Sequence, residues 1–518
     1  MAYRIGIDVG GTNTDAALLD SDKVVIAHTK QPTSSDVMSG IDQAIGALLS
    51  KVSIDKSAIR QAMLGTTHCT NAIVQRKGLN SLVHFRLGAP STLAIPPLSD
   101  IPADLRSMLA AHQFTVGGGY QYNGEHLAPL DEDRIREHLR NVKDVADCVS
   151  ICGVFAPVSS IQEQRVAQLA REELGADISV SLSSEIGSVG LLERENACIL
   201  NAALQSTARS INSGFTQALR RHDIHADIFF SQNDGTLMPL RQAQCFPIHT
   251  IASGPTNSIR GASYLSGIED AVVVDVGGTT TDIGVLSQGF PRESSHAVEI
   301  GGVRTNFRMP DIISIGLGGG SIVTVGGEQD IKIGPESVGY QLTEKALVYG
   351  GDTLTITDIA VAKGLLQLGD KQRVKHLNAD LVERVFVCYV KMVEEAICRL
   401  KTHEEPMPVI LVGGGAGLLP VHLRGASTVI RPQNAGVANA TGVAIAQVSG
   451  SVDTIVSLDQ QDLDACLTDA AARARTAAIT AGAIPDTVTI IDLGFLPLAY
   501  MPGNAIRLRA KAVGTLRF

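Results

Sequence analysis

Two copies of one glycine-rich segment constrain the fold of this 518-residue chain. The first reads Asp8-Val9-Gly10-Gly11-Thr12-Asn13-Thr14-Asp15 and the second reads Asp275-Val276-Gly277-Gly278-Thr279-Thr280-Thr281-Asp282. From Ile7 and Val274 onward, eight of thirteen aligned positions are identical. Apolar runs of strand type precede and follow each copy, which predicts a strand, a turn and a second strand at both places.

The residue types in both copies are those that bind phosphate and its metal. A Gly-Gly turn lets successive backbone N–H groups point at one anion, and threonine hydroxyls add donors. Aspartates at the strand ends can bind Mg²⁺ directly or through its water ligands. We therefore predict a nucleotide polyphosphate, ATP, with Mg²⁺. The predicted nucleotide-binding residues are Gly10, Gly11, Thr12, Asn13, Thr14, Gly277, Gly278, Thr279, Thr280 and Thr281, and the predicted metal ligands are Asp8, Asp15, Asp275 and Asp282, of which Asp8 and Asp275 are also candidate catalytic residues.

Other known glycine-rich motifs fit these loops poorly. A single copy could be only a glycine-containing hairpin turn, but the repetition argues against that. Neither copy has the GxxxxGK[ST] pattern of a P-loop. A dinucleotide fingerprint should open a helix, whereas Ala16 to Leu19 and Ile283 to Leu286 are typical of strands.

Composition limits the class of protein. The net charge is −10 and no Lys/Arg-rich run occurs, so we expect no nucleic-acid partner and no anionic membrane partner. No apolar stretch approaches the length of a membrane span, and the chain begins with a strand instead of a signal peptide. We therefore expect a cytoplasmic protein.

The chain is too long for one core, and its pattern predicts an α/β fold of several domains. We predict an N-terminal ATPase domain at 1–185, a second ATPase domain at 186–450 and a small α+β subdomain at 451–518. Ser160 and Glu163 have the spacing of a helix capping box, and Leu191 to Leu219 has the pattern of one long helix.

Two further glycine clusters follow in the second half. Gly413, Gly414 and Gly415 come directly after an apolar strand, where open α/β sheets bind ligands, so we predict that they contact the adenosine of ATP. The cluster at 316–320 has no assigned role. Either cluster could serve only a tight turn.

Together the two loops, the Gly413-Gly414-Gly415 turn and the helical segment Ala435 to Gly442 resemble the actin, sugar-kinase and heat-shock ATPase superfamily. More narrowly, the chain is similar to the ATP-binding A subunit of the hydantoinase/oxoprolinase family. That resemblance also rests on Gly65-Thr66-Thr67, Asn71 to Gly78, Ser253-Gly254-Pro255, Ser314 to Ser321 and Gly334 to Ser337. The family usually has a histidine where this chain has Leu64.

The resemblance implies duplicated ribonuclease H-like domains with a nucleotide cleft between them. It implies an ATP-dependent hydrolase that opens a cyclic amide, such as a hydantoin or a 5-oxoproline-like lactam, by phosphorylating the amide oxygen. It also implies a B-type partner subunit and allows an oligomer. Thr66, Thr67 and Asn71 offer uncharged donors and acceptors in a polar turn, so we place them near the reacting carbonyl as candidate catalytic residues.

Two other functions compete with this one. A small-molecule kinase of the same superfamily would need an Asp base, and no candidate stands out beyond the four loop carboxylates. A nucleotide-switched activator or binding protein would signal cleft closure to a partner. An activator with an iron–sulfur cluster would need paired cysteines, whereas the eight cysteines here are scattered.

Overall fold

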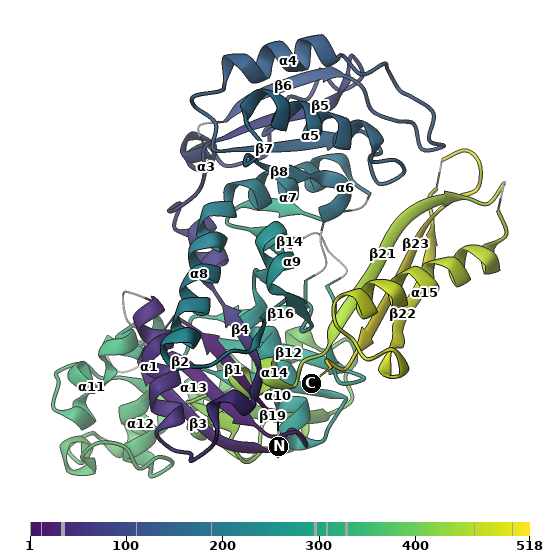
Figure 1. Ribbon diagram of the computed structural model, residues 1–518. Helices are drawn as coiled ribbons and strands as arrows, with labels where there is room; N and C mark the ends of the chain where they lie inside the picture. Colours follow the sequence, from purple (N-terminus) through teal and green to yellow (C-terminus); the bar gives the residue numbers. More distant parts are fainter. Residues whose placement is uncertain are drawn as a thin grey trace.

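A computed structural model shows four connected parts (Figure 1). Two α/β lobes lie together at the bottom of the view, an α/β insertion lies at the top, and a C-terminal subdomain projects to the right. The structure describes residues 2–11, 13–32, 37–109, 111–187, 189–294, 298–306, 309–326, 330–459, 461–499 and 501–517.

The first lobe is built on a sheet with the order β3-β2-β1-β4-β9. Its strands are β1 (Tyr3–Val9), β2 (Asn13–Leu19), β3 (Val25–Pro32), β4 (Ile59–Thr66) and β9 (Asp227–Ser231). β1 and β2 form an antiparallel hairpin, while β4 and β9 run parallel to β1. Helix α1 (Val37–Leu49) packs on this sheet through Ile41, Ile45 and Leu48, which are fully buried.

The second lobe repeats this topology with the order β13-β12-β11-β19-β20. Its strands are β11 (Ala271–Val276), β12 (Thr281–Ser287), β13 (Phe290–Pro291), β16 (Ile312–Ile315, paired with β12), β19 (Met407–Val412) and β20 (Ala426–Ile430). Again a hairpin is followed by two parallel strands. Helix α13 (Ala379–Leu400) buries Val385, Tyr389 and Val393 in this core. The predicted duplicated ribonuclease H-like, actin-like fold is confirmed.

The insertion is a parallel four-stranded sheet with the order β6-β5-β7-β8. Its elements are β5 (Leu82–Ala89), α3 (Ala103–Leu109), β6 (His112–Gly117), α4 (Glu132–Asn141), β7 (Cys148–Gly153), α5 (Ile161–Leu174), β8 (Ser179–Leu182) and α6 (Ser183–Ile186). The capping box at Ser160 and Glu163 is wrong. The Ser160 hydroxyl accepts from the Gln164 side-chain amide (3.0 Å) and caps no backbone N–H, and the Glu163 carboxylate accepts hydrogen bonds from Gly153, Ser183 and Ser184.

Two helices, α7 (Leu191–Ala203) and α8 (Gln205–Arg221), connect the insertion to the lobes where one long helix was expected. The helix breaks at Leu204, where the backbone N–H of Asn80 donates to the Ala203 carbonyl. The remaining elements are α2 (His68–Val74), β10 (Leu237–Pro239), α9 (Leu240–Cys245), the hairpin β14 (Val298–Ile300) and β15 (Val303–Thr305), the hairpin β17 (Ser321–Gly326) and β18 (Asp330–Ser337), α11 (Leu342–Lys345) and α12 (Ile356–Lys363).

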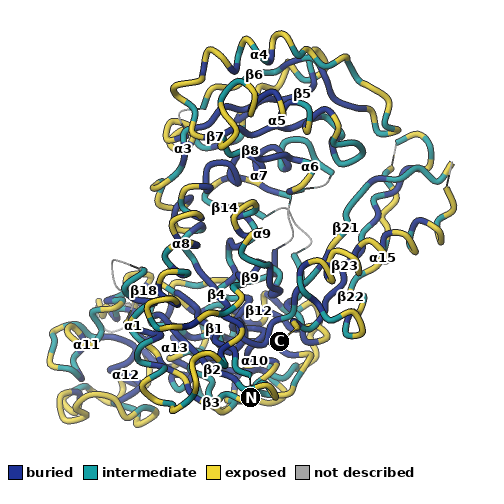
Figure 2. Tube along the Cα trace, in the orientation of Figure 1, coloured by how far each residue is buried: buried dark blue, intermediate teal, exposed yellow. Residues whose placement is uncertain are grey.

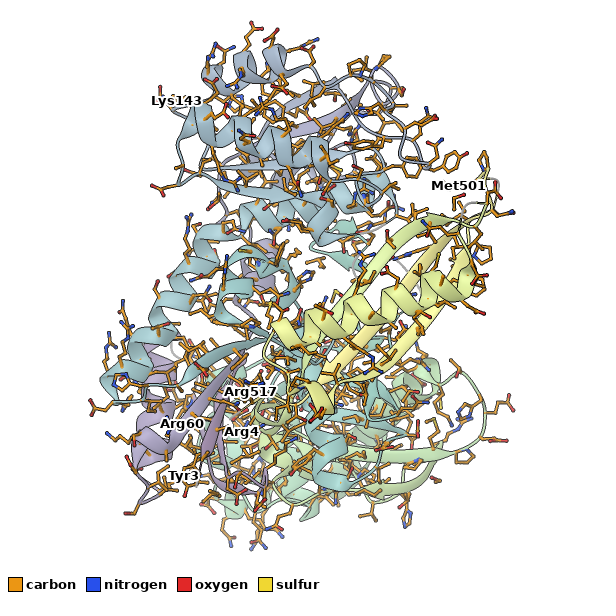
Figure 3. All side chains as sticks on the ribbon, turned by 45° about the vertical axis from the view of Figure 1, so that its right-hand side comes forward. Tyr3, Arg4, Arg60, Lys143, Met501 and Arg517 are labelled. Atoms are coloured by element: carbon orange, nitrogen blue, oxygen red, sulfur yellow. The ribbon has the colours of Figure 1, made fainter. Side chains whose placement is uncertain are left out.

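The C-terminal subdomain consists of β21 (Val448–Ser457), α15 (Leu463–Thr480), β22 (Thr489–Pro497) and β23 (Ala505–Gly514). β21 pairs with β10, so these strands extend the first sheet to nine strands. Figure 3 places Met501 at the tip of this subdomain and Arg517 near Arg4 and Arg60 of the first lobe. The Gln61 amide donates to the Arg517 carbonyl there (2.8 Å).

The domain boundaries predicted at residues 185 and 450 stay a prediction. The sheets do not follow them, because β9 and β10 lie beyond residue 186 and complete the sheet that β1 begins. Within the part of the chain that is described, no helix is both long and apolar enough to cross a membrane.

Two helices cross where the lobes meet. They are α10 (Ser253–Ser266) and α14 (Ala438–Ile445). A Cβ atom added at Gly261 would overlap the Ala438 carbonyl, and one added at Gly442 would overlap the Asn257 carbonyl. The backbones therefore touch directly, and Figure 2 shows this region as part of the buried interior. The crossing fixes the side chains that both helices present to the cleft.

Candidate functional site

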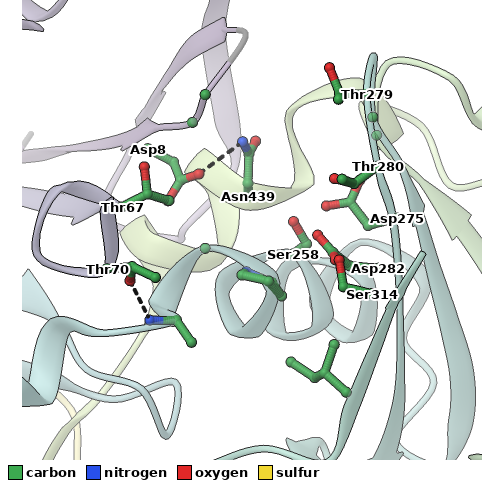
Figure 4. Close-up of a pocket in the computed structure, with 18 of the residues that line it drawn as sticks. Asp8, Thr67, Thr70, Ser258, Asp275, Thr279, Thr280, Asp282, Ser314 and Asn439 are labelled. Atoms are coloured by element: carbon green, nitrogen blue, oxygen red, sulfur yellow. Dashed lines mark hydrogen bonds between the residues drawn. The ribbon is translucent and has the colours of Figure 1, made fainter. Parts of the chain in front are cut away.

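The cleft between the lobes contains a cavity of about 870 Å³, and both glycine-rich loops line it. Figure 4 shows Asp8 and Thr67 on one side and Asp275, Thr279 and Thr280 on the other. The predicted residues that line the cavity are Asp8, Gly10, Gly11, Asn13, Asp15, Thr67, Asn71, Asp275, Gly277, Gly278, Thr279, Thr280, Asp282, Gly413 and Gly414. The structure therefore brings most of the predicted site together across the cleft.

Both loops adopt the same turn. The Gly10 N–H donates to the Asn13 carbonyl (2.9 Å), and the Gly277 N–H donates to the Thr280 carbonyl at the same distance. Each hairpin places its two aspartates directly opposite each other, in the pairs Asp8↔Asp15 and Asp275↔Asp282. Thr14 and Thr281 are buried away from the cavity, and Thr281 donates to the Leu317 carbonyl. Thr12 lies outside the described residues.

Asp8 is held by two amide side chains. Asn257 of α10 donates to one carboxylate oxygen (2.9 Å), and Asn439 of α14 donates to the other (3.1 Å). Asn439 also donates to Asp15 (2.7 Å), which forms an ion pair with Lys30 of β3 (2.7 Å). Sequence reasoning missed these three polar side chains as site residues.

Burial dominates the electrostatics of the cleft. It raises the pKa of Asp8 to about 7, against the lowering effect of the Asn257 and Asn439 hydrogen bonds. It also raises the pKa of Asp282 to about 6 and raises that of Asp275. The neighbouring hydroxyls of Ser314 and Ser258 lower the pKa of Asp282 and of Asp275, respectively, against this effect of burial. Closely placed, poorly hydrated carboxylates of this kind are stabilised by a cation.

The donor set fits Mg²⁺ better than a metal enclosed by protein ligands. Among the described residues, no three His, Cys, Asp or Glu side chains converge as a metal site. Mg²⁺ usually binds one or two carboxylates, its own waters and substrate phosphates, so two facing aspartate pairs suit it. The amino end of α10, with Gly254 and Pro255, also lines the cavity and favours an anion there.

A second pocket, of about 250 Å³, adjoins the main cavity. It shares Asn13, Gly277, Gly278 and Gly414 with the main cavity. Its other lining residues include Gly319, Gly339, Tyr340, Leu342, Leu366, Leu368 and Gly415. A cavity lined by carboxylates and threonines that continues into a pocket lined by leucines and a tyrosine matches a ligand with a charged end and a flat apolar end, as a nucleotide has.

The three glycines after β19 differ in their surroundings. A Cβ added at Gly414 would meet only the Lys30 Cε atom, at 4.0 Å, so this residue faces open cleft. A Cβ at Gly415 would lie 2.6 Å from the Val276 side chain, and Gly413 has a φ of +87°. Gly413 and Gly415 are thus required by the turn and its packing. Their predicted contact with adenosine stays a prediction.

The glycine cluster at 316–320 packs on the second loop. The Gly319 N–H donates to the Gly277 carbonyl (3.0 Å), and the Gly320 N–H donates to the Gly278 carbonyl (2.7 Å). A Cβ at Gly318 would lie 2.7 Å from the Gly277 carbonyl oxygen. Only glycine allows this approach, so the cluster supports the second loop from behind.

Two of the three candidate substrate residues line the cavity, and the third is buried. Thr67 and Asn71 line the cavity together with Thr70, whereas Thr66 is 2% exposed and its hydroxyl is hydrogen-bonded to His68 Nδ1. The same cavity is also lined by Val298, Met309, Pro310, Asp311 and Ile312. Asp311 is a fifth cleft carboxylate that sequence reasoning did not identify, and it forms an ion pair with Arg292 (2.6 Å).

The duplicated fold, with two glycine-rich hairpin loops that face each other across a cleft, is of the actin-like class. Two family models extend this result. Residues 4–174 match the hydantoinase/oxoprolinase N-terminal region, and residues 194–387 match the hydantoinase/oxoprolinase model. The chain belongs to the hydantoinase/oxoprolinase family.

Named relatives come from several enzymes. The chain is 26% identical to the acetophenone carboxylase gamma subunit of Aromatoleum aromaticum, over 70% of this chain and 53% of that subunit. It is 25% identical to the caprolactamase subunit alpha of Pseudomonas jessenii, over 71% and 55% of the two chains. It thus spans about half the length of these curated relatives. The crystal structure of the ATP-dependent caprolactamase from Pseudomonas jessenii has the same fold, with a TM-score of 0.77, 19% identity and coverage of 99% and 88%.

Proposed function

We propose that this chain binds Mg²⁺ and ATP in the cleft and couples ATP hydrolysis to the opening of a cyclic amide, such as a hydantoin or a 5-oxoproline-like lactam. The observation that carries the proposal is the pair of facing loops, with two aspartates opposite each other in each hairpin. The family membership and the relative named caprolactamase support the choice of a cyclic amide.

The chemistry explains why ATP is needed. An unstrained cyclic amide is a poor electrophile, so its carbonyl oxygen must become a better leaving group. In the proposed reaction this oxygen attacks the terminal phosphorus and displaces ADP. Water then adds to the carbon, and the C–N bond breaks with protonation of the departing nitrogen, which leaves an acyl phosphate. A second water attacks the same carbon, so that phosphate leaves with the former amide oxygen. The protein contributes positioning and electrostatic stabilisation.

Each part of the cleft has a role in this proposal. The backbone N–H groups at Gly11 and Gly278 bind phosphate oxygens, and the loop aspartates hold the metal. When bound, Mg²⁺ neutralises phosphate charge. Thr67 and Asn71, which line the same cavity, orient the substrate carbonyl.

A second candidate function is a subunit of a ketone carboxylase. Two relatives favour it, named acetophenone carboxylase gamma subunit and acetone carboxylase beta subunit. Lactams and ketones both present a carbonyl oxygen, so phosphorylation of that oxygen in the cleft is common to both functions. The step that follows phosphorylation differs. Relatives named as subunits also support a B-type partner that completes the site for the attack on the activated carbon.

Oxygen-isotope tracing tests the proposal. The purified chain, alone and with a co-expressed B-type subunit, is incubated with Mg²⁺, ATP and a panel of ¹⁸O-carbonyl lactams and hydantoins. We expect ring-opened acid in step with ADP, with ¹⁸O in the released phosphate, and neither from Asp275→Asn. A stable phosphorylated product indicates a kinase. If the released phosphate contains oxygen from bulk water and no ¹⁸O from the amide, amide activation is overturned. A nucleotide-switched activator is then the favoured function.

A further inference from the structure

Lys30 is a basic residue in a cleft lined by several aspartates. Of the described residues that line the main cavity, Lys30 is the one lysine or arginine, against Asp8, Asp15, Asp275, Asp282 and Asp311. Its side chain is 34% exposed, and its ammonium lies 2.7 Å from Asp15.

The lysine also reaches across the cleft. It belongs to β3 of the first lobe, where it pairs in register with Asp15. Its Cε atom lies 4.0 Å from the position of a Cβ at Gly414, in the second lobe. Its charge also lowers the pKa of Asp275 of the second loop, against the larger effect of burial. Lys30 is therefore a cation placed between the two loops.

We propose that Lys30 exchanges partners when nucleotide binds: its ammonium leaves Asp15 and binds a phosphate oxygen of the nucleotide. This inference rests on the proposed function, because it assumes that a nucleotide occupies the cleft. It adds a positioning residue that links the two lobes through the ligand.

The surroundings of Asp15 allow the exchange. Asn439 donates to the same carboxylate at 2.7 Å, so Asp15 keeps a hydrogen-bond donor when the lysine departs. A polyphosphate carries more negative charge than one carboxylate, and a lysine with a flexible stem can follow it. The partly exposed side chain needs little rearrangement to do so.

The first test separates phosphate binding from nucleoside binding. We expect Lys30→Met to weaken Mg·ATP binding by about 10- to 100-fold, the range for loss of a charge-assisted hydrogen bond. Adenosine, measured by competition, should bind as it does to the parent protein. Lys30→Arg should retain most of the ATP affinity. Lys51→Met is the matched control, because Lys51 also contacts β3, through the His28 carbonyl (2.7 Å), and does not line the cavity.

The second test addresses the exchange itself. In EDTA, Asp15→Asn removes the competing carboxylate, so ADP without metal should bind roughly 3- to 10-fold more tightly. Unchanged or weaker binding by this variant overturns the exchange. Normal ATP binding by Lys30→Met, or equal losses of affinity for ATP and for adenosine, overturns the role of Lys30 but leaves the proposed function standing. Failure of the parent protein to bind ATP overturns the proposed function as well.

Discussion

Replacing Gly442 by alanine should damage both the fold and the site, because this glycine lies where α14 crosses α10. The added Cβ would overlap the backbone carbonyl of Asn257, an atom that no rotamer change can move. The helices must separate by more than about 1 Å to restore ordinary contact. Asn439, on the same helix as Gly442, would then move away from the aspartates.

The expected magnitude follows from these contacts. Alanine stabilises a helix by up to ~1 kcal/mol relative to glycine, but overpacking costs ~1–3 kcal/mol, and backbone overlap falls at the upper end. The hydrogen bonds from Asn439 to Asp15 (2.7 Å) and to Asp8 (3.1 Å) would lengthen beyond the hydrogen-bonding range. Because the Asn439 bond lowers the pKa of Asp8, that pKa should rise from its value of about 7, and the more protonated carboxyl should bind metal more weakly at neutral pH.

The assay combines denaturant unfolding with Mg·ATP titration at pH 7.5. Gly46→Ala in α1 is the matched control, because a Cβ there would meet only His222, at an ordinary 3.4 Å, and the helix should become slightly more stable. If Gly442→Ala unfolds at the parent midpoint and binds Mg·ATP normally, the crossing does not position Asn439. A loss of stability with normal metal affinity would refute the link between the crossing and the aspartates.

Three further outcomes are expected. Gly414→Val should raise the KM for ATP by about tenfold, because its side chain would enter the open cleft, whereas Gly415→Val should mainly lower the unfolding midpoint by overlapping Val276. Burial raises the pKa of Asp8 from 3.8 to about 7, so the free energy of unfolding without metal should fall as pH rises through this range. Mg·ATP binding, measured by calorimetry, should strengthen over the same range, because the ionised carboxylate binds the metal. Thr67→Val should lower kcat/KM for the amide with ATP affinity unchanged, whereas Thr66→Val should reduce stability because it loses the bond to His68.

The two phosphate-type loops could be predicted because each is complete within a short segment. Strand, turn and strand follow one another locally, and both hairpins are confirmed. The polar groups that hold Asp8 could not be found in this way. Asn257 and Asn439 lie 249 and 431 positions away in the chain, and only the crossing of α10 and α14 brings them to the carboxylate. Tertiary contacts of this kind leave no local pattern.

Two predictions of local structure were wrong because a residue forms a hydrogen bond with a distant element of the fold. Glu163 has the spacing of a capping residue, but it is buried against Gly153 and Ser183. The helix expected over Leu191 to Leu219 breaks at Leu204, beside the contact between Asn80 and Ala203. In both cases local preference was replaced by a hydrogen bond between distant segments.

The two loops are alike in sequence but their carboxylates have different partners, and this difference predicts which pair binds the metal directly. Asp8 accepts hydrogen bonds from two amides, and Asp15 contacts an amide and Lys30. Asp275 and Asp282, in contrast, each have a single serine hydroxyl beside them, from Ser258 and Ser314.

A carboxylate with fewer fixed partners has more free lone pairs for a cation. We therefore expect Asp275→Asn to reduce Mn²⁺ binding in the presence of ADP by at least tenfold, and Asp8→Asn to reduce it less. The bound Mn²⁺ can be measured by electron paramagnetic resonance, which does not depend on turnover. Equal losses would show that both pairs contact the metal, and a larger loss for Asp8→Asn would reverse the assignment, because the amide-bound carboxylate would then be the ligand.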